Sequence, residues 1–596
     1  MSSSIRTVVQ ALEDAADSVH TGFRFIDESK KSEPFFTYRD VERATARYAG
    51  AMQAMGLKKG ERITLILPKN QDFVFAFLGA LRAGIVPVPI YPPAGLRKLG
   101  GYLQNTLHVV RKSGARVVLT DGSIRRLLGT VQSGAPDLQR IEAIESLHDS
   151  REPFEPEKIS LDDHCFLQFT SGSTSAPKGV IVSHRNIAAN VRRFMEDGLE
   201  VETGDSGVSW LPLYHDMGLI GFVLGPLFYQ NTMTYLPPIL FLKRPVRWLE
   251  TISRLRASIS FGPNFAYALC VKRIRDADIE GLDLLSWRVA GCGAEPIRAC
   301  DLDAFSRKFA PAGFDRRAML PCYGMAEATL AISFDRLGKG VRTENVDADV
   351  LTGELKARVA DPGRCRVIEV VNCGKTFEDH QVAVFAPEDA ASEKPLPDRA
   401  IGELRVRGPS VTSGYFGEPE LTKEAFAGDW LRTGDVGYIV DGDIFICGRQ
   451  KELIIVNGRN YYPQDLEWEA SRIDGVRKGN VIAFGTGKPL EDRERVVVAF
   501  ETSVSDHDVR ETLKQEVRKA VMRATGLSID DVVDLDAGVL PKTSSGKLRR
   551  NETRRLYETG ELFKRTSARR SDAIGIAKQI VRSQIAYARG ALLMKK

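Results

Sequence analysis

The apolar positions near the start of the chain predict alternating helices and strands. Thr37-Tyr-Arg-Asp40 has the form of an N-terminal capping box, and apolar residues then recur at helical spacing until Gly56. Buried strands are predicted by apolar runs at residues 62–67, 85–90 and 116–120. Residues 73–81 predict a helix between the first two runs. Strand, helix, strand at this spacing indicates a parallel sheet with helical crossovers.

Further along, three strand-like runs each end in a loop of small and polar residues. These runs and loops cover residues 258–265, 287–296 and 321–329. Ligands of open α/β sheets bind where loops leave the carboxyl ends of strands, so the three loops predict a binding site. Residues 401–407 and 434–440 are interpreted as two edges of a smaller β region.

Residues 217–242 carry no charged side chain, and that length would suit a membrane span. Three prolines and the polar Gln230-Asn231-Thr232 interrupt the stretch. We therefore interpret it as a buried helix, a turn and a buried strand, and we predict no transmembrane segment. The first residues also lack the apolar run of a secretory signal.

The composition indicates what type of protein this is and in which cellular compartment it works. A chain of 596 residues exceeds one hydrophobic core, and 43% hydrophobic with 27% charged residues is typical of an ordinary soluble protein. The eight cysteines are scattered, without metal-ligand spacing and too sparse for a disulfide scaffold. A reduced, cytoplasmic protein fits this usage best.

The net charge of +5 is unevenly distributed. Residues 563–596 hold nine lysines and arginines against one acidic residue, Asp572, so the rest of the chain is net negative. No nucleic-acid partner is predicted for that body. The tail has apolar residues on one helical face beside its basic residues, which suits a partner or membrane surface. A helix that packs on its own domain is at least as good an interpretation.

Residues 169–180 have the composition of a phosphate-binding loop. Glycines let a backbone approach an anion, hydroxyls donate hydrogen bonds and Lys178 supplies a charge. The candidate phosphate ligands are Thr170, Ser171, Gly172, Ser173, Thr174 and Lys178. An ordinary polar turn has the same composition, and Gly179 after the lysine departs from the common P-loop pattern.

Other polar residues stand at predicted strand ends. His215 and Asp216 precede the uncharged stretch, where a polar head group and an apolar tail would both find partners, although a structural histidine is the commoner case. Tyr323 suits stacking on a base, and Glu327 suits a hard cation such as Mg²⁺ unless it faces solvent. Asp435 after a tight glycine suits ribose hydroxyls, or simply a turn.

Taken in order, these motifs resemble the adenylate-forming superfamily from residue 36 to about residue 550. The resemblance rests on Thr170-Ser-Gly-Ser-Thr-Ser-Ala-Pro-Lys-Gly179, Tyr323-Gly-Met-Ala-Glu327, Arg432-Thr-Gly-Asp435, Gly448-Arg449 and the loop around Lys547. The chain looks most like the fatty acyl-AMP ligases because of Val88-Pro-Ile-Tyr-Pro-Pro93, Leu213-Tyr-His-Asp-Met-Gly-Leu-Ile-Gly221, Gly262-Pro-Asn-Phe-Ala-Tyr267 and Gly458-Arg-Asn-Tyr-Tyr-Pro-Gln-Asp465. Ser175 and Ala326 depart from the broad superfamily pattern, and the narrower family shares the alanine.

The resemblance implies an α/β fold with two domains. Residues 1–450 would form a large N-terminal domain of several subdomains, with parallel-type sheets and a small β region. Residues 451–562 would form a smaller, mobile α+β domain that rotates about Lys451, followed by the basic helical tail, 563–596. An insertion at about 346–365 resembles the one that distinguishes fatty acyl-AMP ligases. Its apolar residues Val350, Leu351, Leu355 and Val359 are expected to pack on the large domain.

The implied reaction joins a fatty acid to ATP with Mg²⁺, releases pyrophosphate, and passes the acyl group to a phosphopantetheinylated acyl carrier protein. Lys547, Glu327 and His215 would be catalytic, Glu327 would also hold the metal, and Asp435 with Arg449 would bind ribose. Adenine would lie against Tyr323, Gly324, Gly293, Ala294 and Glu295, and the acyl group against His215, Asp216, Phe261, Gly262 and Asn264. A fatty acyl-CoA ligase and a catalytically silent acyl-binding scaffold are the alternatives.

Overall fold

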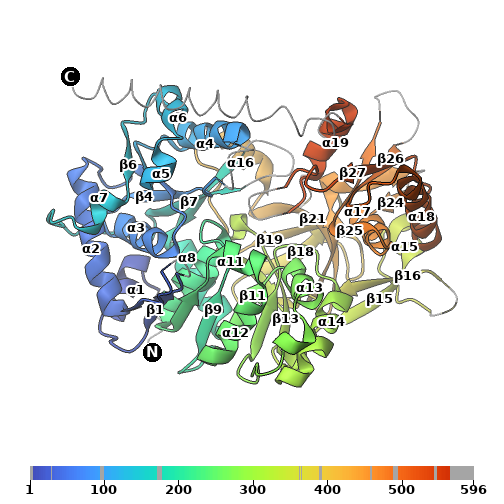
Figure 1. Cartoon of the computed structure of the whole chain (residues 1–596), viewed down its shortest axis with the longest axis horizontal. Helices are drawn as coiled ribbons and strands as arrows, with labels where there is room; N and C mark the ends of the chain where they lie inside the picture. The colour runs from blue at the N-terminus through green and yellow to red at the C-terminus, as the bar shows by residue number, and fades with distance from the viewer. Residues whose placement is uncertain are drawn as a thin grey trace.

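The computed structural model describes residues 5–563 except 28–29, 94–98, 171–176, 362, 364, 388–391, 393, 457–458, 488–493 and 543–546. Ser171, Gly172, Ser173, Thr174 and the tail lie outside the described residues, so their predicted roles stay predictions. The N-terminal parts of the chain lie at one side of the molecule and residues 454–563 at the other (Figure 1).

The first parallel sheet has the strand order β4-β3-β5-β6. Its strands are β3 (Arg62–Ile66), β4 (Val86–Pro89), β5 (Val117–Thr120) and β6 (Arg140–Ala143). The capping box is confirmed: Thr37 Oγ1 accepts from the Asp40 amide, the Asp40 carboxylate accepts from the Thr37 amide, and α2 (Tyr38–Ala54) follows. The predicted crossover helix is α3 (Asn70–Arg82), and parallel pairing of β3 with β4 and β5 confirms the unit. The other helices here are α1 (Val8–Ala15), α4 (Leu99–Ser113), α5 (Gly122–Arg125), α6 (Gly129–Gly134) and α7 (Glu145–His148).

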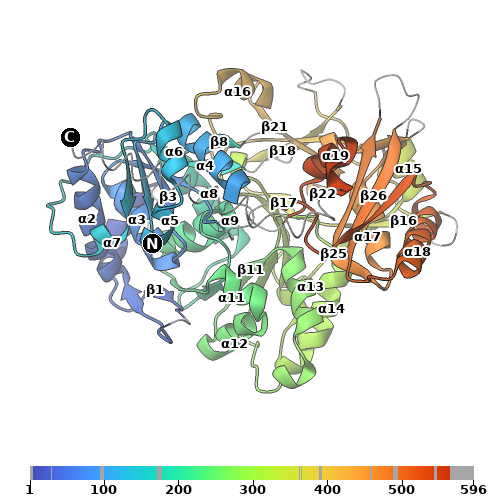
Figure 2. The ribbon, with the colours of Figure 1, turned by 45° about the horizontal axis from the view of Figure 1, so that its top comes forward.

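A larger sheet has the order β17-β14-β13-β12-β11-β9-β10-β1-β2. Its strands are β1 (Gly22–Phe25), β2 (Phe35–Thr37), β9 (Ser206–Ser209), β10 (Thr232–Tyr235), β11 (Ile259–Gly262), β12 (Val289–Cys292), β13 (Met319–Gly324), β14 (Ala331–Phe334) and β17 (Lys375–Thr376). The run from β13 to β1 is parallel, so the loops after β11, β12 and β13 leave the same edge. Helices α11 (Pro238–Lys243), α12 (Val246–Leu255), α13 (Asn264–Arg273) and α14 (Ala299–Phe309) lie together beside β11 (Figure 2).

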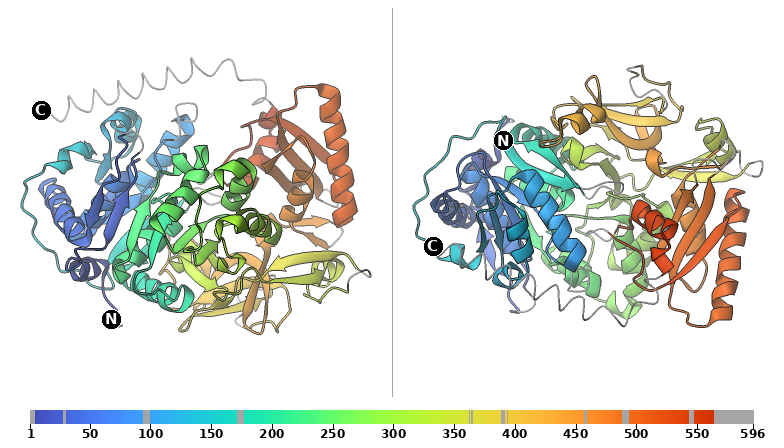
Figure 3. Two further views of the ribbon diagram at one scale, coloured as in Figure 1. Left: turned by 60° about the horizontal axis from the view of Figure 1, so that its bottom comes forward. Right: turned by 90° about the horizontal axis from the view of Figure 1, so that it is seen from above.

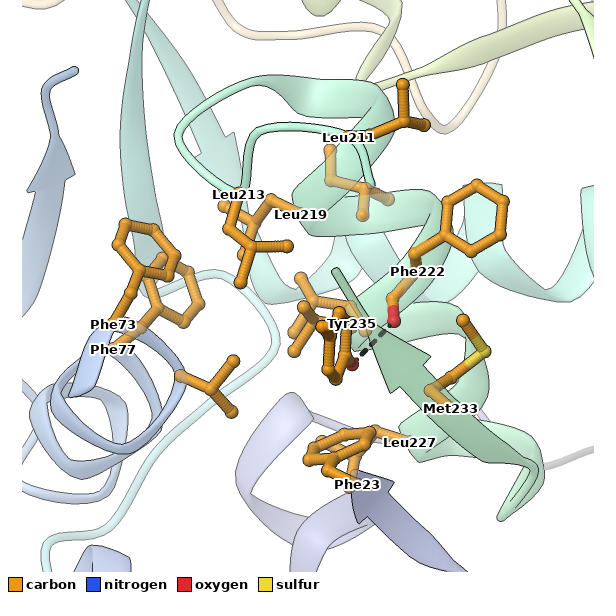
Figure 4. Packing of buried hydrophobic residues seen from close by; sticks show 14 of the residues in the cluster. Phe23, Phe73, Phe77, Leu211, Leu213, Leu219, Phe222, Leu227, Met233 and Tyr235 are labelled. Carbon is orange, nitrogen blue, oxygen red and sulfur yellow. Dashed lines mark hydrogen bonds between the residues drawn. The ribbon is translucent and has the colours of Figure 1, made fainter. Parts of the chain in front are cut away.

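The uncharged stretch forms buried helix, turn and strand, as predicted. The helical part runs through α9 (Asp216–Leu219), a π-helical turn (Ile220–Leu224) and α10 (Gly225–Tyr229), and β10 follows. The Tyr235 hydroxyl on β10 donates to the Phe222 carbonyl at 2.8 Å and so joins strand to helix (Figure 4). Phe23, Leu219, Leu227 and Met233 belong to the same apolar core. No helix in the described ranges is long and apolar enough to cross a membrane.

The candidate phosphate loop joins two antiparallel strands, β7 (His164–Thr170) and β8 (Lys178–Ser183). Thr170 and Lys178 are register partners at the base of this hairpin. The helix α8 (His184–Arg193) follows β8, and it begins with a capping box at Ser183. Both ends of the loop are therefore held by strand pairing and a capped helix.

The smaller β region corrects one interpretation. Its strands are β18 (Gln381–Phe385), β19 (Gly402–Arg407), β20 (Phe426–Ala427), β21 (Trp430–Val440) and β22 (Asp443–Arg449), with α16 (Pro419–Ala425) between β19 and β20. The strands predicted as two edges, β19 and β21, pair with each other inside the sheet, and β18 covers the other side of β19. Both have buried residues on successive positions, so both faces of the sheet are covered there.

The predicted insertion folds as β15 (Thr343–Asp347), α15 (Ala348–Gly353) and β16 (Val367–Val371), with β15 and β16 antiparallel. Val350 and Leu351 are buried, and Leu351 packs with Tyr438 and Phe445 of the β region. Val359 is 59% exposed, so the expectation that it packs on the large domain is wrong.

Residues 454–563 form an α+β unit with separate apolar cores (Figure 3). Its elements are β23 (Ile454–Val456), β24 (Arg459–Tyr461), α17 (Pro463–Ser471), β25 (Val476–Thr486), β26 (Arg495–Thr502), α18 (His507–Thr525), β27 (Asp531–Asp536) and α19 (Arg550–Glu558). The predicted hinge residue Lys451 lies exposed in a 3₁₀ turn, Gln450–Glu452, between β22 and this unit. The fold class predicted from the sequence, a large α/β domain with a smaller α+β domain, is confirmed.

Candidate active site

In the loops after β12 and β13, two glycines lie against the backbone of neighbouring segments. A Cβ at Gly293 would lie 2.9 Å from the Cys322 carbonyl oxygen, and one at Gly324 would overlap the Leu330 carbonyl oxygen. Ala294 has a φ of 68°, a left-handed conformation that leaves it exposed at the strand edge. These small residues leave an open shelf of backbone beside Tyr323, as a planar ligand would require.

Tyr323, Asp435 and Arg449 form one hydrogen-bonded group. The Tyr323 hydroxyl donates to Asp435 Oδ2 at 2.6 Å, and Arg449 Nε donates to Oδ1 at 3.0 Å. Asp435 and Arg449 are register partners on β21 and β22, which places their side chains on one face. Asp435 is buried while Arg449 is exposed, and the Asp435 carboxylate raises the pKa of the guanidinium. The Asp435 carboxylate is therefore held in place from two sides, by Tyr323 and by Arg449.

A second group lies on the phosphate-loop side. The Tyr415 hydroxyl donates to Glu327 Oε1 at 3.0 Å, and Lys178 Nζ sits 4.8 Å from the centroid of the Tyr415 ring. Burial raises the pKa of Glu327, although the Tyr415 hydrogen bond opposes the shift. A half-buried carboxylate beside a phosphate-loop lysine suits a divalent cation shared with phosphates, because Mg²⁺ is commonly held by one or two carboxylates plus substrate oxygens.

His215, Asp216 and Lys547 meet where the two domains face each other. Burial lowers the pKa of His215 to about 4, Asp216 opposes this shift and Lys547 adds to it, so the imidazole is neutral at pH 7. The pKa of Lys547 is lowered, because desolvation of the ammonium group outweighs the opposing effect of the Glu295 and Asp216 carboxylates. The Lys547 side chain stays exposed to solvent in the cleft. A lysine from the C-terminal unit thus stands among acidic residues of the large domain.

An apolar pocket with a cavity volume of about 80 Å³ lies beside Asp216. Asp216, Ala294, Tyr323 and Gly324 line its mouth, and Phe261 lines its wall. The pocket continues between the uncharged helical segment and the large sheet. Its lining is largely hydrocarbon, so it fits an apolar group.

Three of the five residues predicted to bind the acyl group, His215, Gly262 and Asn264, are not among the residues that line this pocket. Asn264 Nδ2 donates to Asp301 Oδ2 at 2.7 Å, and Asn264 Oδ1 accepts from the Arg298 amide, so its amide joins α13 to the start of α14. Gly262 faces Trp248 and Ala266. Neither belongs to the described lining of the pocket. Tyr415 was missed by sequence reasoning, because no local pattern connects it with a glutamate 88 positions away.

Comparison with known proteins decides the family. Residues 19–416 match the AMP-binding enzyme family. The chain is 39% identical to a putative acyl-CoA synthetase of Caulobacter vibrioides, over 93% of this chain and 96% of the relative. It is 33% identical to the medium-chain-fatty-acid–[acyl-carrier-protein] ligase JamA of Moorena producens, over 91% and 93%. A structure from work on fatty acyl-adenylate ligases of E. coli and L. pneumophila superposes with a TM-score of 0.88 and 34% identity, covering 94% of this chain and 99% of the other.

The chain belongs to the fatty acyl-AMP ligases. The family predicted from the ordered motifs is therefore confirmed. The ligase uses ATP and activates a fatty acid as its adenylate.

Proposed function

We propose that this ligase activates a fatty acid as acyl-AMP and passes the acyl group to the phosphopantetheine thiol of an acyl carrier protein. The placement of Lys547 near Asp216, which lines an apolar pocket, carries the proposal, since it brings a positive charge close to an apolar binding site. The Moorena producens relative is named for transfer to a carrier protein, which supports that acceptor.

In the first step a fatty acid carboxylate oxygen bonds to the α-phosphorus of ATP. The bond from that phosphorus to the bridging oxygen breaks, and pyrophosphate leaves. The carboxylate is already ionised, so no general base is required. Lys547 neutralises the charge that gathers on the carboxylate and α-phosphate oxygens in the transition state. In the second step the carrier thiolate attacks the acyl carbonyl and AMP leaves.

Other residues bind and orient the substrates. Asp435 and Arg449 hold the ribose hydroxyls, and Tyr323 with Gly293, Ala294, Glu295 and Gly324 forms the adenine shelf. Thr170, Lys178 and the loop between them receive the β- and γ-phosphates. Glu327 would hold Mg²⁺, which neutralises phosphate charge when bound. The neutral His215 with Asp216 borders the carboxylate, and Phe261 contacts the acyl chain.

The acceptor is the point to test, since the Caulobacter vibrioides relative is named as an acyl-CoA synthetase. The purified ligase is incubated with ATP, Mg²⁺ and a fatty-acid panel, with either CoA or a phosphopantetheinylated carrier protein, and products are identified by mass spectrometry. We expect acyl-AMP in both mixtures and acyl transfer only to the carrier protein. Efficient acyl-CoA formation would favour the CoA ligase, and no pyrophosphate release would favour a silent scaffold.

The insertion supports the preference for the carrier protein. Arg459 of β24 pairs with Asp349 of α15 at 3.2 Å, and Arg366 donates to the Ala524 carbonyl at the end of α18 at 3.2 Å. Arg366 and Asp349 also pair with each other. These contacts tie the insertion to the C-terminal unit on the far side of Lys451. We propose that they restrain the rotation that would admit the CoA thiol.

Asp349→Ala with Arg366→Ala is expected to form acyl-CoA at a small but detectable rate, while adenylation is unchanged. The effect is small because exposed ion pairs contribute little each. The double variant keeps the buried Val346 and Leu351, which a deletion of residues 346–365 would remove from the core. Arg358→Ala is the matched control, because its ion pair with Asp347 stays inside the insertion. Equal acyl-CoA formation by all three proteins would show that CoA exclusion does not depend on these contacts.

We also propose that the ligase works in the reducing cytoplasm. All eight cysteines lie in described positions and are free thiols, which supports that compartment.

A further inference from the structure

The inner end of the acyl pocket is polar although its walls are not. The pocket leads away from the catalytic loops toward the amino ends of the parallel strands, where Ser206 pairs with Thr232 and Gly207 with Ile259. It therefore spans the length of β11, about 13 Å at the rise of a strand, plus the loops at each end. Phe222 and Met233 line the apolar stretch (Figure 4). Asp205, Ser206 and Asn231 line the inner end.

Asp205 is fully engaged by the protein. Its Oδ1 accepts from Arg288 Nε at 3.0 Å and from the Ser258 hydroxyl at 2.6 Å. Its Oδ2 accepts from the Glu202 amide at 2.8 Å and pairs with the Arg288 guanidinium. The guanidinium also donates to the carbonyls of Leu199 and Glu200, so this ion pair closes the end of the pocket. The charge of Asp205 is therefore balanced by Arg288, and both of its carboxylate oxygens already accept hydrogen bonds from the protein.

The side-chain oxygen of Asn231, in contrast, has no hydrogen-bond donor among the described residues. Its amide N–H donates to the Pro226 carbonyl at 3.0 Å, and its carbonyl accepts from the Tyr38 hydroxyl at 2.7 Å, so its backbone is held firmly. Its Nδ2 donates to the Asp205 carbonyl at 3.1 Å. The residue is only 9% exposed, and no described residue donates to its buried Oδ1. An unpaired buried acceptor is costly, and such atoms in folded proteins usually have a partner.

We propose that Asn231 Oδ1 accepts a hydrogen bond from a hydroxyl group at the far end of the acyl chain. The inner end of the pocket is then a subsite for medium-length fatty acids with a terminal hydroxyl, and Asn231 is a specificity-determining residue. A plain methyl terminus leaves Oδ1 unpaired, whereas a hydroxyl satisfies it and its own buried donor together. A site built to bond a hydroxyl discriminates more strongly than an apolar pocket can.

The inference rests on the proposed adenylation, and the test separates the two. Straight-chain alkanoic acids of eight to sixteen carbons and their ω-hydroxy counterparts are assayed for acyl-AMP formation, and kcat/KM is compared at each length. We expect the parent to favour the ω-hydroxy acid at the length that reaches Asn231. Asn231→Leu should lower the hydroxy-to-plain ratio about tenfold and keep activity on the plain acid.

Met233→Leu is the matched control, because it changes the same pocket with a similar volume and no polar atom. It should affect both series of acids alike and leave the hydroxy-to-plain ratio unchanged. The same ratio in the parent and Asn231→Leu overturns the subsite. If Asn231→Leu does not fold, a parent that favours the plain acid at every length also overturns it. The absence of acyl-AMP from every acid would instead overturn the adenylation on which the inference rests.

Discussion

Replacing Lys547 with alanine is expected to lower the rate of acyl-adenylate formation about 10²-fold or more, with ATP binding nearly unchanged. The ammonium group meets charge that develops only as the carboxylate reaches the α-phosphate, so it stabilises the transition state more than the bound substrates. It lies within electrostatic reach of the acidic side chains of Glu295, Asp216 and Asp435. Single-turnover pyrophosphate release measures the chemical step, and equilibrium binding of ATP measures the ground state.

Lys542→Ala is the control, since it removes another lysine from the same segment and leaves Lys547 in place. A Lys547→Ala enzyme with the turnover of the parent would remove this residue from the mechanism. The alkaline limb of the pH profile adds a second readout. The pKa of Lys547 is lowered by its dense surroundings, so the charged form is lost at a lower pH than for an ordinary lysine. The parent rate should therefore begin to fall earlier on the alkaline side, and the residual rate of Lys547→Ala should lack that step.

Glu327→Gln is expected to raise the Mg²⁺ concentration for half-maximal adenylation at least tenfold. A neutral amide is a poorer ligand for a hard cation, and changes around metal sites commonly cost 10–100-fold in affinity. Titration of the pyrophosphate-release rate with Mg²⁺ at saturating ATP makes the measurement.

Tyr415→Phe is the matched control for Glu327. It removes the hydrogen bond to Glu327 Oε1 but keeps the ring beneath Lys178 and the carboxylate itself. If the Mg²⁺ concentration for half-maximal adenylation rises little in Tyr415→Phe and strongly in Glu327→Gln, the carboxylate charge of Glu327 is what binds the Mg²⁺. An identical Mg²⁺ dependence in Glu327→Gln and the parent would make Glu327 a structural residue.

Local patterns were sufficient for the elements and for the motifs at their ends. The capping box at Thr37 predicted the start of α2, and the prolines in the uncharged stretch predicted a buried helix and strand instead of a membrane span. These features depend on neighbours a few positions apart, where helix and strand periods are distinct. The family also followed from ordered motifs, because each is a short segment with its own chemistry.

Contacts between distant segments were decided by the tertiary structure. The bonds from Tyr323 to Asp435 and from Tyr415 to Glu327 join residues 112 and 88 positions apart. The pairing of β19 with β21 replaced the expected two edges, and Val359 proved exposed although its pattern suited burial. From the sequence, Asn231 was interpreted as part of a turn. Only the packing of Asp205 and Arg288 near it places it at a polar end of the pocket. The type of a side chain determines whether it needs an apolar neighbour or a hydrogen-bond partner. Strand order and register determine which residue is close enough to be that partner.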